Sequence, residues 1–272
     1  QLMQHIDSYG SGMLILYDEK ITDVSFQTIK EIIDHINFNI CLCGGWAVYL
    51  TVNDHFKKQK DMNYIGSQDI DIGFSLKPMM GKTALESTNL FKMIKLLEHR
   101  GYTPSMFGYK KNIPFNHIGI SRNEGEEKNF TLYIDILVNS YPQSYQDIHP
   151  QSFFEVPLIE KVYADKKYQV KLSQISNYLF MPTRDLLGAM KIKSLPSRGK
   201  QHKMVKDLCD LYSLIWFADE PPDEIISKIT SILVPTSIKR LKKSINKNMM
   251  SKCEQYLSEP QGSIETVISK IN

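Results

Sequence analysis

The chain has 272 residues, of which 42% are hydrophobic and 23% charged, which is typical of a globular protein with one large domain or two smaller ones. Its four cysteines are too few for a disulfide scaffold, and no Cys-x-x-Cys pair is present, so we expect buried free thiols and no zinc site. No apolar run reaches the roughly 20 residues that a membrane span needs, and the first ten residues lack the layout of a signal peptide. We therefore expect a cytoplasmic protein with no membrane partner.

Positive charge is unevenly distributed along the chain. The formal net charge is +3, yet the segment 182–257 holds 14 Lys and Arg against 8 Asp and Glu. This balance is compatible with a polyanionic ligand, and equally with a solvated helical surface rich in lysine.

The first part of the sequence alternates helix and strand patterns. Apolar residues recur at helical spacing after Asp23, and the pattern of alternate apolar residues that defines a half-buried strand is clear from Asp69. We expect helices at 23–36, 46–53 and 87–100, strands at 38–43, 69–76, 102–109, 115–121 and 130–138, a loop or helix extension at 55–66, a charged hairpin tip at 123–129, and short extended segments within 153–175.

The last third of the sequence has only helical patterns, with prolines between them. We expect helices at 183–195, 202–217, 223–233 and 236–256. A mixed half followed by a helical half predicts an α+β protein with a sheet-containing domain at 1–181 and a helical bundle at 182–272.

Two aspartates share one side of the strand predicted at 69–76. Asp69 and Asp71 project from one face, while Ile70, Ile72 and Phe74 project from the other. Two neighbouring carboxylates repel each other unless a cation lies between them, and hard oxygen ligands of this kind suit magnesium. Asp135 lies in the middle of another apolar strand, and an adjacent strand position would complete a set of three carboxylates able to hold two metal ions.

A pair of glycines, Gly44 and Gly45, lies between a predicted buried strand and a predicted helix. Backbone can approach a phosphate closely there, and the start of a helix offers free N–H groups. A Gly-Gly pair alone is usually a turn, and Asp-x-Asp alone is usually a capping or surface feature. The order of strand, Gly-Gly, helix, Asp-x-Asp strand and a later Asp strand is what favours catalysis.

With these motifs the chain resembles the nucleotidyltransferase superfamily with a polymerase beta-like core, and most closely the AbiEii/AbiGii-type toxin nucleotidyltransferases. The matching segments are Cys-Gly-Gly-Trp-Ala at 43–47, Ser-Gln-Asp-Ile-Asp-Ile at 67–72, Tyr-Ile-Asp-Ile at 133–136, Leu-Leu-Gly-Ala-Met-Lys at 186–191, Arg198, and Lys-Asp-Leu-Cys-Asp-Leu-Tyr at 206–212.

The resemblance implies a twisted mixed sheet of the nucleotidyltransferase type, with a helical domain that completes the nucleotide and acceptor site. It implies transfer of a nucleoside monophosphate from a nucleoside triphosphate to a hydroxyl, two Mg²⁺ ions (or Mn²⁺) and, as partners, a tRNA 3′ end and a cognate antitoxin. Asp69, Asp71 and Asp135 would hold the metals. The nucleotide would be bound by Gly44, Gly45, Ser67, Lys191, Arg198, Asp207 and Asp210, with Lys191 also catalytic.

Other interpretations remain at this point. Lys191 and Lys193 suit a solvated helix surface, Asp207 suits a minor salt bridge with Lys203 or Arg198, and Tyr212 suits core packing. A small molecule such as an antibiotic, or a protein side chain, is an alternative acceptor. A catalytically silent nucleotide-binding module is an alternative function of the chain. Gly45 also stands where many relatives have a serine, and Trp46 where they have a small residue.

Overall fold

The computed structural model describes residues 17–121, 126, 128–149 and 151–272; the N-terminal residues 1–10 and most of the predicted hairpin tip lie outside this part. The chain divides into two compact units. The sheet unit comprises Glu19–Ala47 and Gly66–Thr183, and the helical unit comprises Val48–Ile65 and Arg184–Asn272, with Tyr17 and Asp18. The boundary between Thr183 and Arg184 lies close to the one expected at 181/182. The sequence did not predict that Val48–Ile65 belongs to the helical unit.

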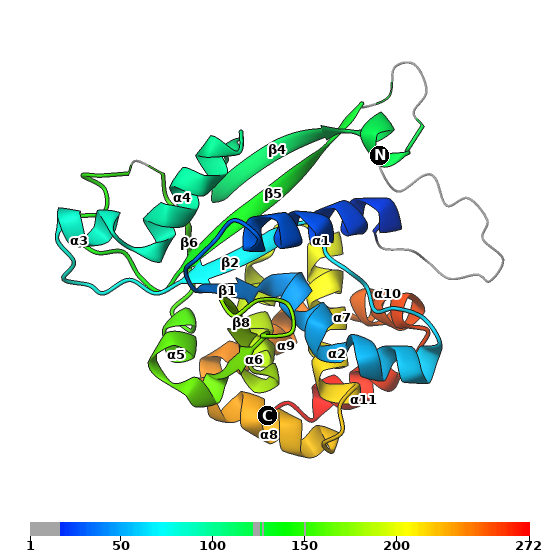
Figure 1. The fold of residues 1–272 in the computed structure, drawn as a ribbon. Helices are drawn as coiled ribbons and strands as arrows, with labels where there is room; N and C mark the ends of the chain where they lie inside the picture. Colours follow the sequence, from blue (N-terminus) through cyan, green and yellow to red (C-terminus); the bar gives the residue numbers. More distant parts are fainter. Residues whose placement is uncertain (1–16, 122–125, 127, 150) are drawn as a thin grey trace. The chain divides into compact units, whose positions relative to one another are not determined.

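Within the described residues, eight strands form one mixed sheet in the order β3-β4-β5-β2-β1-β8-β7, with β6 paired to β5 (Figure 1). Strands β2 and β5 are parallel, as are β1 and β8, whereas β1 pairs antiparallel with β2 and β4 with β5. The strands are β1 (Ile40–Cys43), β2 (Ile70–Phe74), β3 (Thr103–Pro104), β4 (Gly108–Pro114), β5 (Asn129–Val138), β6 (Phe154–Glu155), β7 (Gln169–Lys171) and β8 (Leu179–Pro182).

The central strands alternate as their sequences predict. In β2, Ile70 and Ile72 are buried while Asp71 between them is half-buried, and in β5 the same alternation places Asp135 opposite buried Ile134 and Ile136. The apolar side chains on one face of these strands therefore pack in the core, and the opposite face carries the carboxylates. The α+β class with a mixed sheet is confirmed.

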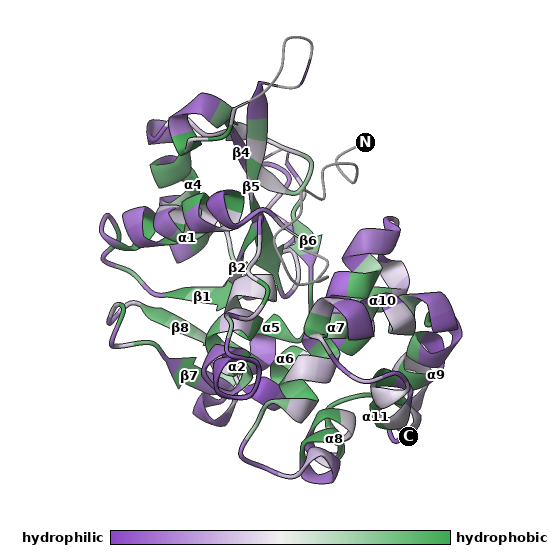
Figure 2. Ribbon diagram, turned by 90° about the vertical axis from the view of Figure 1, so that its right-hand side faces the viewer, coloured by the Kyte–Doolittle hydropathy of each residue, from purple (hydrophilic) through white to green (hydrophobic). Residues whose placement is uncertain are grey.

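The helices of the sheet unit pack apolar faces against the sheet. They are α1 (Glu19–Ile33), α3 (Lys82–Glu86), α4 (Asn89–His99) and α5 (Ile159–Ala164), with 3₁₀ turns η1 (Phe115–Ile118) and η2 (Lys166–Tyr168). Figures 1 and 2 both show α1 and α4 on the same face of the sheet. In α1, the buried Ser25 hydroxyl accepts a hydrogen bond from Trp46 Nε1 at 2.8 Å, which ties α1 to the start of the next helix.

Several boundaries in the sheet unit differ from the sequence-based ones. The segment 115–121 is not a strand, because Pro114 lacks an N–H and Gly119 is left-handed (φ 68°), and between them lies the 3₁₀ turn η1. The hairpin partner of β5 is β4 instead. Helix α5 and strand β8 were not predicted, and Asp69 lies just before β2, not inside it.

The helical unit contains α6 (Arg184–Ser194), η3 (Leu195–Ser197), α7 (Gln201–Trp216), α8 (Pro222–Ser231), α9 (Pro235–Ser244), α10 (Lys247–Leu257) and α11 (Ser263–Ser269). Gly188 lets α6 and α8 approach closely, since a Cβ there would lie 2.5 Å from Ile229 Cδ1. Helix α2 (Gly44–Lys60) begins in the sheet unit and continues into this one. The helix extension at 55–66 is thus real as far as Lys60, since buried Phe56 packs edge-on against Phe217 with ring centroids 4.8 Å apart.

The single helix expected at 236–256 is two helices. Ile245 is extended, and the Asn246 side chain accepts a hydrogen bond from Met249 N at 3.0 Å, so Asn246 caps a new helix, α10. Helices α6, α7 and α8 are confirmed within a few residues of the expected ends.

The cysteines behave as expected. Cys41, Cys43, Cys209 and Cys253 are buried free thiols. The hydrogen bond between the Cys43 and Cys41 thiols, followed by burial, raises the pKa of Cys43 well above its ordinary value, so the thiolate is disfavoured. Among the described residues, no helix combines the length and apolarity that a membrane span requires.

Candidate functional site

The glycine pair lies at the point where β1 becomes α2. Gly44 is the first residue of α2 and has a φ of 62°, a conformation that favours glycine. A Cβ built on Gly44 would lie 1.8 Å from Asp71 Oδ2. The carboxylate of Asp71 therefore lies directly against the backbone at the start of α2, where the helix dipole favours negative charge. A carboxylate or a phosphate group is stabilised at such a position for the same reason.

The strand register places Asp71 and Asp135 side by side. They are direct partners in the parallel pair β2–β5, and Asp71 is also the partner of Cys43 in the antiparallel pair β1–β2. Both carboxylates are half-buried, on the face of the sheet that the apolar residues of these strands leave open. The structure thus brings together two predicted site residues that are distant in the sequence.

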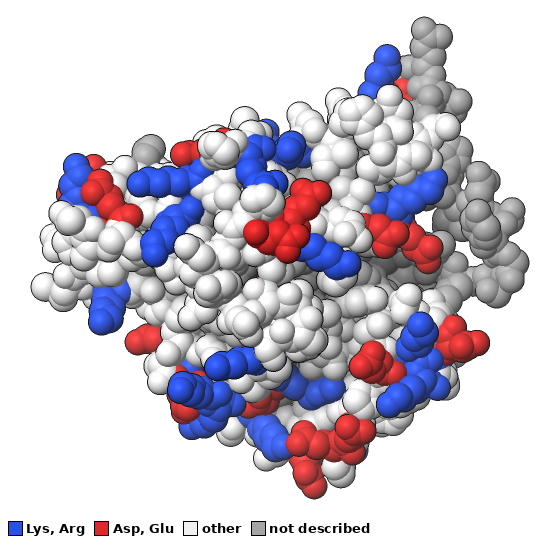
Figure 3. Space-filling model, in the orientation of Figure 1, with Lys and Arg blue, Asp and Glu red and all other residues white. Residues whose placement is uncertain are grey.

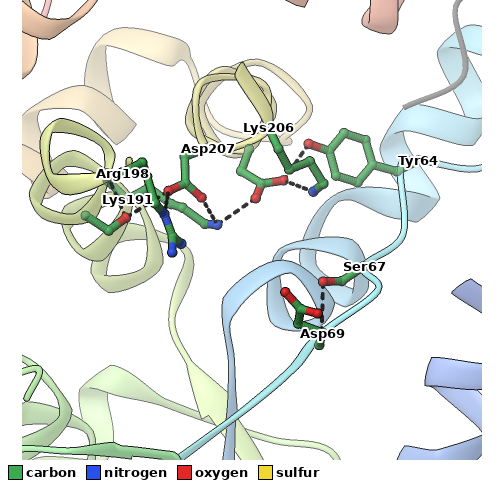
Figure 4. Close-up of polar contacts among 9 residues, drawn as sticks. Tyr64, Ser67, Asp69, Lys191, Arg198, Lys206 and Asp207 are labelled. Atoms are coloured by element: carbon green, nitrogen blue, oxygen red, sulfur yellow. Dashed lines mark hydrogen bonds and ion pairs between the residues drawn. The ribbon is translucent and has the colours of Figure 1, made fainter. Parts of the chain in front are cut away.

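Asp69 and Ser67 lie in the segment that enters β2. The Ser67 hydroxyl donates to the Asp69 backbone carbonyl oxygen at 2.9 Å, so this hydroxyl shapes the turn before the strand (Figure 4). Asp69 is half-buried and lies two residues before Asp71, so an extended backbone would direct both side chains to the same side. Its role as a third carboxylate remains a prediction.

The fit to magnesium can be judged from the carboxylates present. In the part of the chain that the structure describes, no group of three His, Cys, Asp or Glu side chains is arranged to hold a metal ion. Magnesium is ordinarily bound through one or two carboxylates, with waters and substrate phosphates as its other ligands. The neighbouring pair Asp71 and Asp135 fits that requirement, whereas the three-carboxylate, two-metal site stays a prediction.

A second cluster of predicted residues lies in the helical unit. The Lys191 ammonium on α6 lies between two carboxylates of α7, 2.6 Å from Asp207 Oδ1 and 2.7 Å from Asp210 Oδ2 (Figure 4). Arg198 Nε donates to Asp207 Oδ2 at 2.7 Å, and the Ser194 hydroxyl donates to the same oxygen at 3.1 Å. The structure therefore joins four of the predicted nucleotide-binding residues into one hydrogen-bonded network.

Burial makes this network different from a surface salt bridge. Lys191, Asp207 and Asp210 are all buried, whereas the Arg198 side chain is 34% exposed. Burial alone would lower the pKa of Lys191, but the Asp207 and Asp210 carboxylates outweigh it and raise that pKa. Burial would likewise raise the pKa of Asp207, but Lys191 and Arg198 hold it well below its usual range. Lys191 and Asp207 are therefore both charged at neutral pH.

The structure also decides between the alternatives for the lysines of α6. Lys193 is exposed and fits the solvated interpretation, whereas Lys191 does not. Asp207 does form a salt bridge with Arg198, but it is a buried one with a second cation. Tyr212 is fully buried and stacks on Trp216 with centroids 5.9 Å apart, which confirms core packing.

Three members of the network were not predicted: Ser194, Lys206 and Tyr64. Lys206 pairs with Asp210, four residues later on α7, and its ammonium lies 5.2 Å from the centre of the Tyr64 ring. The Tyr64 hydroxyl donates to Asp210 Oδ1 at 2.8 Å. The spacing of Lys206 and Asp210 was a usable signal. Tyr64 gave none, since it is a single aromatic residue in a polar segment.

No protein-family model matches the chain, and no curated protein matches it in sequence. Among solved structures, the chain is similar to an antigenic nucleotidyltransferase-like protein from Paracoccidioides brasiliensis, with 17% sequence identity and a TM-score of 0.40 over 85% of this chain and 96% of that chain. A likeness this distant carries no weight for function, so the proposals below rest on the residues of this chain.

Proposed function

We propose that the protein is a metal-dependent nucleotidyltransferase, which transfers a nucleoside monophosphate from a nucleoside triphosphate to an acceptor hydroxyl and releases pyrophosphate. The observation that carries the proposal is the register pairing of Asp71 with Asp135, beside a helix start where Gly44 leaves room for the Asp71 carboxylate. Two carboxylates held together in this way suit a divalent cation that also binds phosphate oxygens.

The roles of the residues follow from their positions. Asp71 and Asp135 would hold magnesium, with Asp69 as the predicted third ligand, and magnesium there would neutralise phosphate charge. The backbone N–H groups of Gly44 and Gly45, at the start of α2, would donate to phosphate oxygens. Asp135 would also accept the proton of the acceptor hydroxyl. The hydroxyl oxygen attacks the α-phosphorus of the nucleotide at the same time, and the bond between that phosphorus and the pyrophosphate oxygen breaks.

The nucleotide-binding roles of Lys191, Arg198, Asp207 and Asp210 remain part of this proposal. Lys191 is already neutralised by two aspartates, so its influence on a phosphate would be weaker than that of the more exposed Arg198. Substitution of Arg198 by Gln is expected to raise KM for the nucleotide more than it lowers kcat. A phosphate contact that is present both in the bound substrate and in the transition state strengthens binding but does not lower the barrier between them.

For the acceptor, we propose a tRNA 3′ end, as expected of a toxin with a cognate antitoxin. The excess of Lys and Arg in the helical half supports a polyanionic acceptor. The alternatives are a small-molecule acceptor such as an antibiotic, a protein acceptor, and a silent nucleotide-binding module.

The test is incubation with each α-labelled nucleoside triphosphate, magnesium and total RNA. The wild type and a matched surface variant, Asp34→Asn, are expected to label RNA equally, since Asp34 is exposed in the turn that follows α1. Asp71→Asn and Asp135→Asn are each expected to lower labelling by about 100-fold or more. If the Asp71→Asn variant labels as well as wild type, the proposal fails; label in a small molecule or in protein would instead select one of the alternatives.

A further inference from the structure

A long part of the helical unit carries only positive charge. Between Glu224 and Glu254 the sequence has seven Lys and Arg and neither Asp nor Glu. Four of the seven belong to the ten residues of α9. Elsewhere the charges alternate: on the face drawn in Figure 3, acidic and basic side chains are interspersed. The helix α9 is therefore the most one-sided charged element of the helical unit.

The cations of α9 lie on the face opposite its buried side. Ile238 and Leu241 are buried and anchor the helix. Lys239, Arg240 and Lys243 are exposed and, with Thr236, follow the i, i+3, i+4, i+7 spacing of a single helix face. Figure 2 shows the hydrophilic colour over much of α9. Three cations and a hydroxyl thus form a stripe roughly 10 Å long, at 1.5 Å per residue.

This stripe is not neutralised within the described structure. None of the salt bridges among the described residues involves Lys239, Arg240 or Lys243. Like charges three and four residues apart destabilise a helix by a few tenths of a kcal/mol per pair. An anionic ligand spread over several charges would reverse that effect.

We infer that the α9 stripe, made of Thr236, Lys239, Arg240 and Lys243, is a docking surface for the phosphate backbone of RNA. Lys, Arg and hydroxyl side chains are the groups that contact nucleic-acid phosphates. A membrane surface is disfavoured because the apolar side of α9 is buried in its own unit and is not available for insertion. An acidic protein is disfavoured because the exposed stripe lacks the aromatic and apolar residues that form the centre of protein interfaces. That this RNA is the acceptor rests on the proposed function.

The test measures binding without catalysis. Fluorescence anisotropy of a labelled tRNA is recorded without nucleotide over a range of salt concentrations. The test variant is Lys239→Gln/Arg240→Gln/Lys243→Gln, which keeps good helix formers at each position. The matched control is Lys77→Gln/Lys82→Gln/Lys95→Gln, which removes three exposed lysines from the sheet unit. Circular dichroism melting of each variant reports on folding.

The wild type and the control are expected to bind tRNA with similar Kd. The α9 variant is expected to bind roughly 10- to 100-fold more weakly near 0.1 M salt, and to reduce the slope of log K against log salt by about 2 to 3, since each phosphate contact contributes 0.7 to 0.9. An unchanged Kd and slope in a folded α9 variant would overturn the inference. So would tighter binding of polyglutamate or of phosphatidylserine vesicles than of tRNA.

The binding result is separable from the proposed function. If tRNA binding depends on α9 while no preparation transfers a nucleotide to any acceptor, the docking surface stands and the enzymatic proposal fails. If the enzyme labels RNA and the α9 variant binds and labels as the wild type does, the enzymatic proposal stands and the docking surface fails.

Discussion

Asp71 and Asp135 are direct register partners in the parallel strands β2 and β5, although 63 residues separate them in the chain. Their side chains share one face of the sheet, and the carboxylate of Asp71 also lies against Gly44 at the start of α2. The sheet therefore fixes two carboxylates as neighbours, and one of them lies against a helix start, where the backbone dipoles favour negative charge.

Removal of divalent metal is expected to destabilise the wild type. Magnesium bound by Asp71 and Asp135 relieves their repulsion, so a saturating concentration at about 100 times Kd would add about 2.7 kcal/mol, or several degrees in Tm. Scanning fluorimetry with magnesium and with EDTA measures the shift. Asp34→Asn should retain the shift and Asp71→Asn should lose most of it; an equal shift in both variants would count against metal binding at this pair.

Substitution of Gly44 by Ala is expected to be more costly than the left-handed backbone alone explains. Gly101 also has positive φ (77°), but nothing lies within 4 Å of a Cβ built there, so Gly101→Ala isolates the backbone cost of about 1 kcal/mol. Gly44→Ala adds the clash with Asp71 and should unfold at clearly lower urea concentration. The double variant Gly44→Ala/Asp71→Gly, which removes Oδ2, Cγ and Cβ of residue 71 from within 3 Å of the new Cβ, should recover part of the stability but not activity, and no recovery would mean that Asp71 is not the obstacle.

Replacement of Lys191 by Met is expected to lower the free energy of unfolding by about 3 to 5 kcal/mol, because Asp207 and Asp210 would remain buried without the cation between them. Lys193→Met on the same helix is the matched control, since Lys193 is exposed, and should change stability by less than about 0.5 kcal/mol. Urea midpoints at pH 7 compare the two. Equal midpoints would show that the Lys191 network adds little stability.

The network should also shape the acid dependence of stability. The folded-state pKa of Asp207 is lowered, so its contribution is present above the unfolded-state pKa of about 3.9 and is lost as pH falls through the folded-state value. The pKa of Lys191 is raised, so its contribution persists until pH rises above the unfolded-state value of about 10.4. The stability difference between wild type and Asp207→Asn, from urea titrations, should be constant from about pH 5 to 9 and shrink below about pH 4. A difference that grows on acidification would contradict this assignment.

The sequence predicted the local features of the site better than its assembly. Strand alternation located Asp71 as the half-buried residue between buried Ile70 and Ile72, because a period of two is a property of the backbone itself, whereas the shared face of Asp69 and Asp71 stays a prediction. It did not show which strand would lie beside β2, since pairing of Asp135 with Asp71 depends on contacts far apart in the chain. The strand β8 was missed for a related reason: its burial depends on pairing with β1.

In the helical half, periodicity found the helices but not all of their ends. The break at Ile245–Asn246 had a signal, an asparagine able to cap, but the apolar spacing continues through it. Lys206 could have been assigned from its spacing to Asp210, four residues later, whereas Tyr64 acquires its role only from the position of Asp210, so no local pattern could assign it.

The division of the chain has a practical consequence for fragments. The helical unit takes in Val48–Ile65, where Phe56 packs against Phe217 and the Thr51 carbonyl oxygen accepts a hydrogen bond from Arg184. A fragment ended at residue 181 would keep Phe56 and Thr51 but lose Phe217 and Arg184, so part of the apolar Phe56 ring would be exposed to water. No single cut in the polypeptide can therefore release either unit intact. A stable isolated sheet unit would require residues 48–65, which belong to the helical unit, to be replaced by a short linker.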